Sequence, residues 1–105
     1  MTDPDIHDHP EACRYELEVD GEIAFVSYNL SPPNLMITKT RTPPRLEGRG
    51  IASRLTRHVL ADARRRGLLI LPVCSFFAAY LQKHPEFADV THSTYRDILD
   101  LNSQS

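Results

Sequence analysis

Residues 43–52 have the composition of an anion-binding loop. The segment holds Gly48 and Gly50 and leads into a predicted helix with no Ser, Thr, Asp or Asn at the expected cap position. Such a helix start leaves its first backbone N–H groups without a side-chain acceptor. Glycine allows close approach to the backbone, and this end of a helix is positive, so a phosphate or pyrophosphate would suit it. Arg45 and Arg49 add positive charge to the same place.

Spacing alone leaves a second interpretation open, a glycine turn that carries exposed arginines. Two other phosphate-binding patterns fit this sequence less well. A Walker A loop needs Gly-Lys followed by Ser or Thr, which is absent here. A dinucleotide fingerprint needs a third glycine in a strand–helix–strand unit, whereas this chain begins with predicted hairpins.

Cys74 is the second candidate for chemistry. It follows the apolar run Leu68 to Val73, a pattern typical of central strands covered on both faces, and precedes a helix expected to begin near Ser75. A strand's carboxyl end beside a helix N-terminus is a common place for ligand chemistry and favours a thiolate. The dipole contributes only roughly 0.3–1 kcal/mol, so a nucleophilic Cys74 would need a nearby base or arginine. A small buried thiol that packs against the sheet is the alternative.

Three strands are predicted before the glycine loop. They span residues 13–19, 22–30 and 35–42. Alternation in the first places Cys13 on the buried side, in a structural role, and Asp20-Gly21 is a strong hairpin signal. The third strand carries alternating threonines and ends at Pro43-Pro44, because proline cannot donate to a ladder.

A helix is predicted over residues 50–66. Its apolar stripe recurs every four residues, at Ile51, Leu55, Val59 and Ala63. Gly67 is a natural residue to end it. A fourth strand (68–73), a second helix (75–83) and a short element within 90–101 follow. Since a helix joins the third and fourth strands, we expect that pair to be parallel, in a mixed α/β sheet.

The 105 residues fit one domain. Residues 1–12 are acidic, contain two prolines and lack periodicity, so we expect a flexible acidic arm before a domain at 13–101 and a polar tail at 102–105. His7 and His9, with three aspartates nearby, could hold a metal. We favour a solvated arm and no metal site.

Charge is unevenly distributed along the chain. The net charge is −2, yet eight of the twelve basic residues are arginines between Arg41 and Arg66. This favours a local anion site over a general nucleic-acid binder, which would also need interleaved aromatic residues. There is no apolar signal region or membrane-spanning run, so we expect a cytoplasmic protein with reduced thiols and no membrane contact.

Two stretches of the sequence resemble a known family. Arg45-Leu46-Glu47-Gly48-Arg49-Gly50 matches the Arg/Gln-x-x-Gly-x-Gly/Ala signature of GNAT acetyltransferases, between a strand and a helix as in that family. Residues 71–87 are similar to small single-domain GNAT-like proteins with a Pro-x-Cys-x-Phe…Tyr…Lys-His-Pro-Glu pattern. The resemblance covers roughly residues 13–90. It implies the compact GNAT acyl-CoA N-acyltransferase fold, a mixed and mainly antiparallel sheet with flanking helices, splayed between the third and fourth strands.

The resemblance also implies a cofactor, acetyl-coenzyme A. Its pyrophosphate would bind the amides of residues 46–52, its pantetheine arm would run beside residues 41–43, and its thioester would point towards Cys74. The implied cofactor-binding residues are Arg41, Thr42, Pro43, Arg45, Leu46, Glu47, Gly48, Arg49, Gly50, Ile51, Ala52, Cys74, Phe76 and Lys83. Cys74 and Tyr80 are the implied catalytic residues, with Tyr80 protonating the departing thiolate. Core packing for Tyr80, and a helix-ending charge for Lys83, are the alternatives.

The implied function is acetyl transfer to an unidentified amine, directly or through Cys74, by a monomer or weak homodimer. The alternative is a non-catalytic module that binds or senses coenzyme A. Relatives often carry His-Thr-Glu on the third strand, where this chain has Lys39-Thr40-Arg41. That departure leaves the general base unnamed, and an arginine there could instead grip an acidic acceptor or the cofactor.

Overall fold

A five-stranded sheet forms the centre of the protein, whose computed structural model describes residues 3–101. The strands are β1 (Ile6–His9), β2 (Arg14–Val19), β3 (Glu22–Ser31), β4 (Asn34–Arg41) and β5 (Leu69–Pro72), in that spatial order. The first four strands pair antiparallel, and β4 pairs parallel with β5. The mixed, mainly antiparallel sheet and the parallel final pair are as the sequence predicts.

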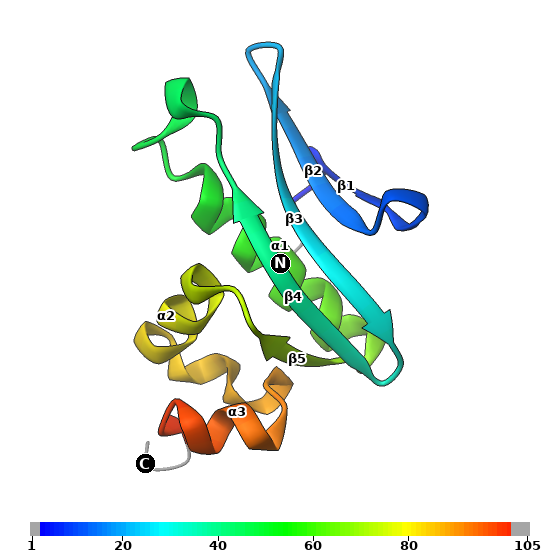
Figure 1. Ribbon diagram of the computed structural model, residues 1–105, viewed down its shortest axis with the longest axis vertical. Coiled ribbons are helices and arrows are strands. Elements are labelled where there is room, and N and C mark those ends of the chain that lie inside the picture. Colours follow the sequence, from blue (N-terminus) through cyan, green and yellow to red (C-terminus); the bar gives the residue numbers. More distant parts are fainter. Residues whose placement is uncertain (1–2, 102–105) are drawn as a thin grey trace.

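In the described part of the chain, three α-helices accompany the sheet: α1 (Ile51–Arg66), α2 (Ser75–Lys83) and α3 (Ser93–Ile98). Short 3-10 turns lie at Pro10–Ala12, Pro44–Leu46 and Pro85–Val90. In Figure 1, α1 crosses behind the sheet, while α2 and α3 gather beside β5. No helix within residues 3–101 is long and apolar enough to cross a membrane.

The core lies between α1 and the sheet. The predicted apolar stripe of α1 is confirmed, because Ile51, Leu55, Val59 and Ala63 are all buried. The sheet contributes the buried side chains of Tyr15, Leu17, Ala24, Val26, Leu35 and Ile37. Gly67 ends α1 in a left-handed conformation (φ 70°), and its N–H group donates to the carbonyl of Arg64, so the predicted stop is also confirmed.

The expectation of a flexible arm over residues 1–12 is wrong for residues 6–12. Ile6–His9 forms β1, which pairs with β2, and Ile6 is buried in the core. The Tyr28 hydroxyl donates to Asp8 Oδ1 at 2.6 Å, which fixes the strand further. A four-residue strand with one apolar side chain carries too little periodicity to be found from sequence.

The structure also corrects the role expected for Cys13. Cys13 is exposed and has a left-handed backbone (φ 54°) at the turn between β1 and β2, so it does not face the core.

The apolar run of residues 68–73 forms an edge strand, not a central one covered on both faces. The outer edge of β5 meets the later chain at a single parallel bridge between Ile70 and Thr91, and His92 N–H donates to the Ile70 carbonyl at 2.9 Å. Ile70 is buried, whereas Leu69 and Leu71 are half-buried. The C-terminal segment covers this edge strand, which explains why the strand is so apolar. The hydrophobic pattern of residues 68–73 does not reveal that cover.

Two irregularities in β4 set up the site. The β3–β4 register shifts between Ser27 and Tyr28, so Thr40 lies opposite buried Val26 and faces α1. Pairing of β4 with β5 ends at Ile37 and Pro72, although β4 continues to Arg41. The two strands therefore part beyond Ile37, as the resemblance implies.

Candidate functional site

The glycine loop leaves the first turn of α1 open. Gly48 (φ 81°) and Gly50 (φ 76°) both take the left-handed conformation that favours glycine, and no side chain caps the helix at Gly50. The first backbone bond of the helix runs from Arg54 N–H to the Gly50 carbonyl at 3.0 Å. The N–H groups of residues 51–53 precede this bond and are free to bind an anion.

The stretch of available amides is shorter than expected. Leu46 N–H already donates to the Pro43 carbonyl at 2.9 Å, and Glu47 N–H to the Pro44 carbonyl at 3.3 Å. These bonds close the turn Pro44–Leu46 and bury the Leu46 side chain. The N–H groups of residues 46 and 47, which were expected to contact the pyrophosphate, are thus used within the loop. The candidate backbone donors to an anion begin at Gly48.

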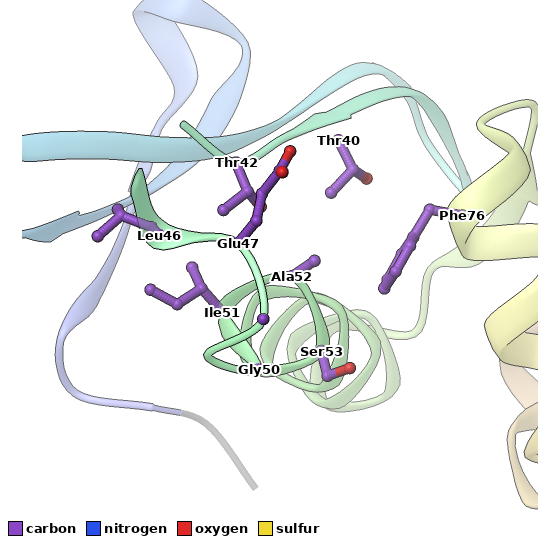
Figure 2. A pocket seen from close by; sticks show the side chains of 10 residues that line it. Thr40, Thr42, Leu46, Glu47, Gly50, Ile51, Ala52, Ser53 and Phe76 are labelled. Carbon is purple, nitrogen blue, oxygen red and sulfur yellow. The ribbon is translucent and has the colours of Figure 1, made fainter. Parts of the chain in front are cut away.

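A pocket of about 380 Å³ opens in front of these amides. It is lined by Thr40, Thr42, Leu46, Glu47, Gly48, Gly50, Ile51, Ala52, Ser53 and Phe76. Figure 2 shows Thr40 from β4 and Thr42 just after it on one side, the start of α1 on another, and Phe76 reaching in from α2. Segments far apart in the chain thus converge on one cavity.

Arg45 and Arg49 do not line the pocket. Arg49 Nη1 binds Asp20 Oδ2 at 2.8 Å, and Arg45 Nη1 lies 3.4 Å from Glu22 Oε2. The Arg49 guanidinium holds the pKa of the Asp20 carboxyl below its ordinary value. Both arginines therefore tie the loop to the β2–β3 hairpin, and their expected role beside a phosphate would require them to leave these partners.

Cys74 lies where β4 and β5 have parted. It immediately precedes α2, and its N–H group donates to the Ile37 carbonyl at 2.9 Å. The half-buried thiol donates to Thr40 Oγ1 at 3.4 Å. Thr40 also lines the pocket, so a single hydroxyl group lies between the Cys74 thiol and the cavity.

A second pocket of about 430 Å³ continues the first along α2. The two share Ser53 and Phe76, and the second is also lined by Ala79, Tyr80, Lys83 and His84. The helical spacing of residues 76, 79, 80 and 83 places them on one face of α2.

Tyr80 is largely buried beside this second pocket. Its ring stacks on His84 with 4.1 Å between centroids. Within residues 3–101 its hydroxyl has no hydrogen-bond partner. The core-packing alternative would require a hydrogen bond from the Tyr80 hydroxyl to a structural partner, and this hydroxyl makes none among the described residues.

Arg41 and Pro43 do not line either pocket, whereas Thr42 does. Arg41 pairs with Phe25 across the sheet, on the face opposite to Thr40, and its side chain is exposed. Thr40 and Ser53, which line the cavity, are absent from the sequence-based set. The alternating threonines of the third strand were the available signal for Thr40.

The opposite end of α1 carries a separate polar cluster. Tyr15 hydroxyl donates to Asp62 Oδ2 at 2.7 Å, and Asp62 also binds Arg65 and Arg66. Burial, and then the Asp62 carboxylate, raises the pKa of Tyr15. Asp8 lies 3.7 Å from Arg66, so β1 is joined to the same cluster. Among the described residues, no group of three His, Cys, Asp or Glu side chains could hold a metal ion.

Comparison with known proteins agrees with this architecture. The family model of GCN5-related N-acetyltransferases matches residues 14–90. The chain belongs to this family. Among solved structures it resembles the NMR solution structure of a GCN5-like protein from Staphylococcus aureus, with a TM-score of 0.68 and 24% sequence identity over 88% of this chain and 91% of that one. No curated protein matches the chain significantly.

Proposed function

We propose that this member of the GCN5-related N-acetyltransferases binds acetyl-coenzyme A at the glycine loop and transfers its acetyl group to an amine. One observation carries the proposal: the uncapped start of α1 faces a pocket that leads, through Thr40, to the Cys74 thiol. An anion site and a candidate reacting group are thereby joined by one cavity.

The residues present fit the cofactor's chemistry. The backbone N–H groups from Gly48 to Ser53 would bind the pyrophosphate, helped by the positive end of α1. Phe76 and Thr42 would form the walls beside the pantetheine arm. Glu47 is the only acidic side chain among those that line the first pocket, and it is exposed, so water screens its charge.

The thiol's surroundings favour direct transfer over a covalent enzyme intermediate. Within residues 3–101 its hydrogen-bond partner is the Thr40 hydroxyl, which is not a base at neutral pH. A nucleophilic thiol needs a group that removes its proton. Cys74 would therefore line the thioester site while the amine nitrogen attacks the acetyl carbon, and Tyr80 would donate its hydroxyl proton to the leaving thiolate.

Isothermal titration calorimetry with acetyl-coenzyme A and with coenzyme A tests the binding claim. We expect saturable binding of both ligands, and absence of binding for both would refute the proposal.

Mass spectrometry then tests the route of transfer. We expect no acetyl adduct on the intact protein after incubation with acetyl-coenzyme A, and retained acetylation of amines by Cys74→Ala. An acetyl adduct that disappears in Cys74→Ala, together with lost turnover, would instead show transfer through Cys74.

A further inference from the structure

Within residues 3–101, one face of β2, β3 and β4 has no helix over it. Figure 1 shows α1 behind β3 and β4, and α1 also contacts β2; nothing lies across the other side of these strands in the described part of the chain. Lys39 and Arg41 lie on this open face, because they pair with Ser27 and Phe25 while Thr40 between them faces the pocket. Both side chains are exposed.

These two cations differ from most others in the protein. Within the described residues, seven arginines lie within 4.0 Å of a carboxylate oxygen: Arg14, Arg45, Arg49, Arg54, Arg64, Arg65 and Arg66. The side chains of Lys39 and Arg41 have no ion-pair or hydrogen-bond partner within residues 3–101. Two residues apart on a strand, their Cα atoms are separated by about 6.7 Å, so both can reach one anionic group.

The cation pair lies at the reacting end of the site. Thr40, between the two, accepts the hydrogen bond from the Cys74 thiol. Beyond Ile37, β4 has no pairing with β5, so a molecule on the open face can reach the thiol around the unpaired edge of β4. The cofactor pocket occupies the α1 side, which leaves the open face for the acceptor.

We propose that the acetyl acceptor is an acidic amine, whose carboxylate or phosphate binds Lys39 and Arg41 on the open face. This rests on the acetyltransferase function proposed above. Arg41 offers a planar fork of N–H donors for two oxygens, and Lys39 a compact positive charge. Phe25 is half-buried beside Arg41, and the Arg14 guanidinium, itself paired with Glu16, lies over its ring at 4.5 Å from the ring centre.

The anchored amine then reacts without further groups on this face. Its nitrogen forms a bond to the acetyl carbon, the carbon–sulfur bond breaks, and sulfur keeps the electron pair. One proton leaves the nitrogen for solvent, and the thiolate takes one from Tyr80, which solvent reprotonates.

Matched amines test the proposal with the full-length protein. The N-acetyl product is quantified by mass spectrometry with β-alanine against propylamine and with phosphoethanolamine against ethanolamine. We expect kcat/KM about tenfold or more higher for the acidic member of each pair, the size expected for a charge-assisted hydrogen bond. The larger of the two ratios tells whether a carboxylate or a phosphate is the better ligand.

Charge removal assigns the effect to the two residues. In Lys39→Gln/Arg41→Gln the kcat/KM of each acidic amine should fall to that of its neutral partner. Arg57→Gln, which removes another exposed cation without an ion-pair partner in residues 3–101, should leave the advantage intact.

Three results would overturn this proposal while leaving cofactor binding established. They are equal turnover of acidic and neutral amines, a preference that survives in the double variant, and no acetylation of either acidic amine by protein that binds acetyl-coenzyme A. Failure to bind the cofactor would instead refute the proposed function itself.

Discussion

The two ends of α1 are built in opposite ways. At the N-terminal end, two left-handed glycines lead into a helix without a side-chain cap, and the first amides face a pocket. At the C-terminal end, Gly67 closes the helix and Asp62 binds Tyr15 and two arginines. One helix therefore combines an end whose donors are left unused with an end whose charges are paired.

The residues that stabilise the fold and those available for ligand binding therefore lie at opposite ends of one 16-residue helix. An unused donor loses little free energy only where water can reach it, so the open end must lie at the surface beside a cavity. A buried carboxylate is tolerated only where partners surround it, so the closed end can lie against β1 and β2. Substitutions at the closed end should change folding, and those at the open end should change ligand affinity.

The largest effect is expected for Asp62→Ala. Asp62 is 5% exposed, and its loss leaves the Tyr15 hydroxyl and the Arg66 guanidinium without their main partner. We expect the free energy of unfolding in urea to fall by about 3 kcal/mol, with acetyl-coenzyme A affinity of the folded fraction unchanged.

Asp89→Ala is the matched control for this prediction. It removes an exposed pair with Arg64, in which 58% and 47% of the two side chains are accessible, so its effect should stay below about 1 kcal/mol. Equal losses for the two variants would show that the Asp62 cluster is not a special anchor.

Gly50→Ala should show the reverse pattern. A Cβ atom at Gly50 meets no other atom within 4 Å, so it would project into free space at the pocket, and the left-handed backbone adds strain of roughly 1–2 kcal/mol. We expect acetyl-coenzyme A affinity to fall about tenfold in calorimetry, as the methyl group obstructs approach to the first amides of α1.

Gly67→Ala separates strain from binding, because Gly67 has a similar φ of 70° and equally open surroundings at the other end of α1. It should lower stability by a similar amount and leave affinity unchanged. A loss of affinity in both variants would mean that strain, and not the free amides, controls binding.

Local patterns were enough to predict the open end but not the closed one. The glycines, the missing cap and the stripe of α1 are contiguous in sequence, so elementary helix chemistry predicts both the uncapped start and the buried face. The bounds of α2 match the prediction, since Pro85 follows shortly after it. The parallel β4–β5 pair follows from the intervening helix.

The closed end depends on contacts that no local pattern carries. Tyr15 and Asp62 are 47 positions apart, and Asp8 joins them from a strand too short to be recognised. Ion pairing also decides what the arginines can bind: Arg49 lies within the glycine loop, yet its side chain binds Asp20 in the β2–β3 hairpin. Spacing predicted where positive charge gathers, and only the fold shows which charges are already paired.

His58 gives the closed end a pH dependence. Asp3 N–H donates to His58 Nδ1 at 2.8 Å, so the folded state needs this nitrogen unprotonated. Burial lowers the pKa of His58, although Asp62, Asp3 and Asp8 oppose the shift. The unfolded chain therefore takes up a proton at this residue first as pH falls below about 6.5, and stability should decline from there down to the lower pKa of the folded state.

Urea denaturation at pH values from 7 to 5 measures this decline. His58→Asn keeps an acceptor near Nδ1 but does not titrate, so its stability should change less across the range. Below pH 4 both proteins should lose stability, because the pKa values of Asp3 and Asp62 are lowered in the folded state. Parallel curves between pH 7 and 5 would contradict the assignment to His58.

The smallest predicted effect concerns the charge that already holds Arg49 beside the open end. Asp20→Asn removes the carboxylate that binds Arg49 at 2.8 Å while keeping a residue that tolerates the left-handed backbone of this turn (φ 53°). Released from its partner, Arg49 can approach a phosphate on the loop. We expect acetyl-coenzyme A affinity to rise about two- to threefold, with little change in stability because the pair is exposed.

Salt and a neighbouring variant separate this effect from net charge. The gain should shrink at high ionic strength, where exposed charges are screened. Glu18→Gln removes an exposed carboxylate from the same hairpin and should give a smaller gain. An equal gain in both would mean that Arg49 stays on the hairpin when the ligand binds. In that case the backbone amides and the dipole of α1 hold the phosphate alone, and the open end works through its unused donors rather than through its arginines.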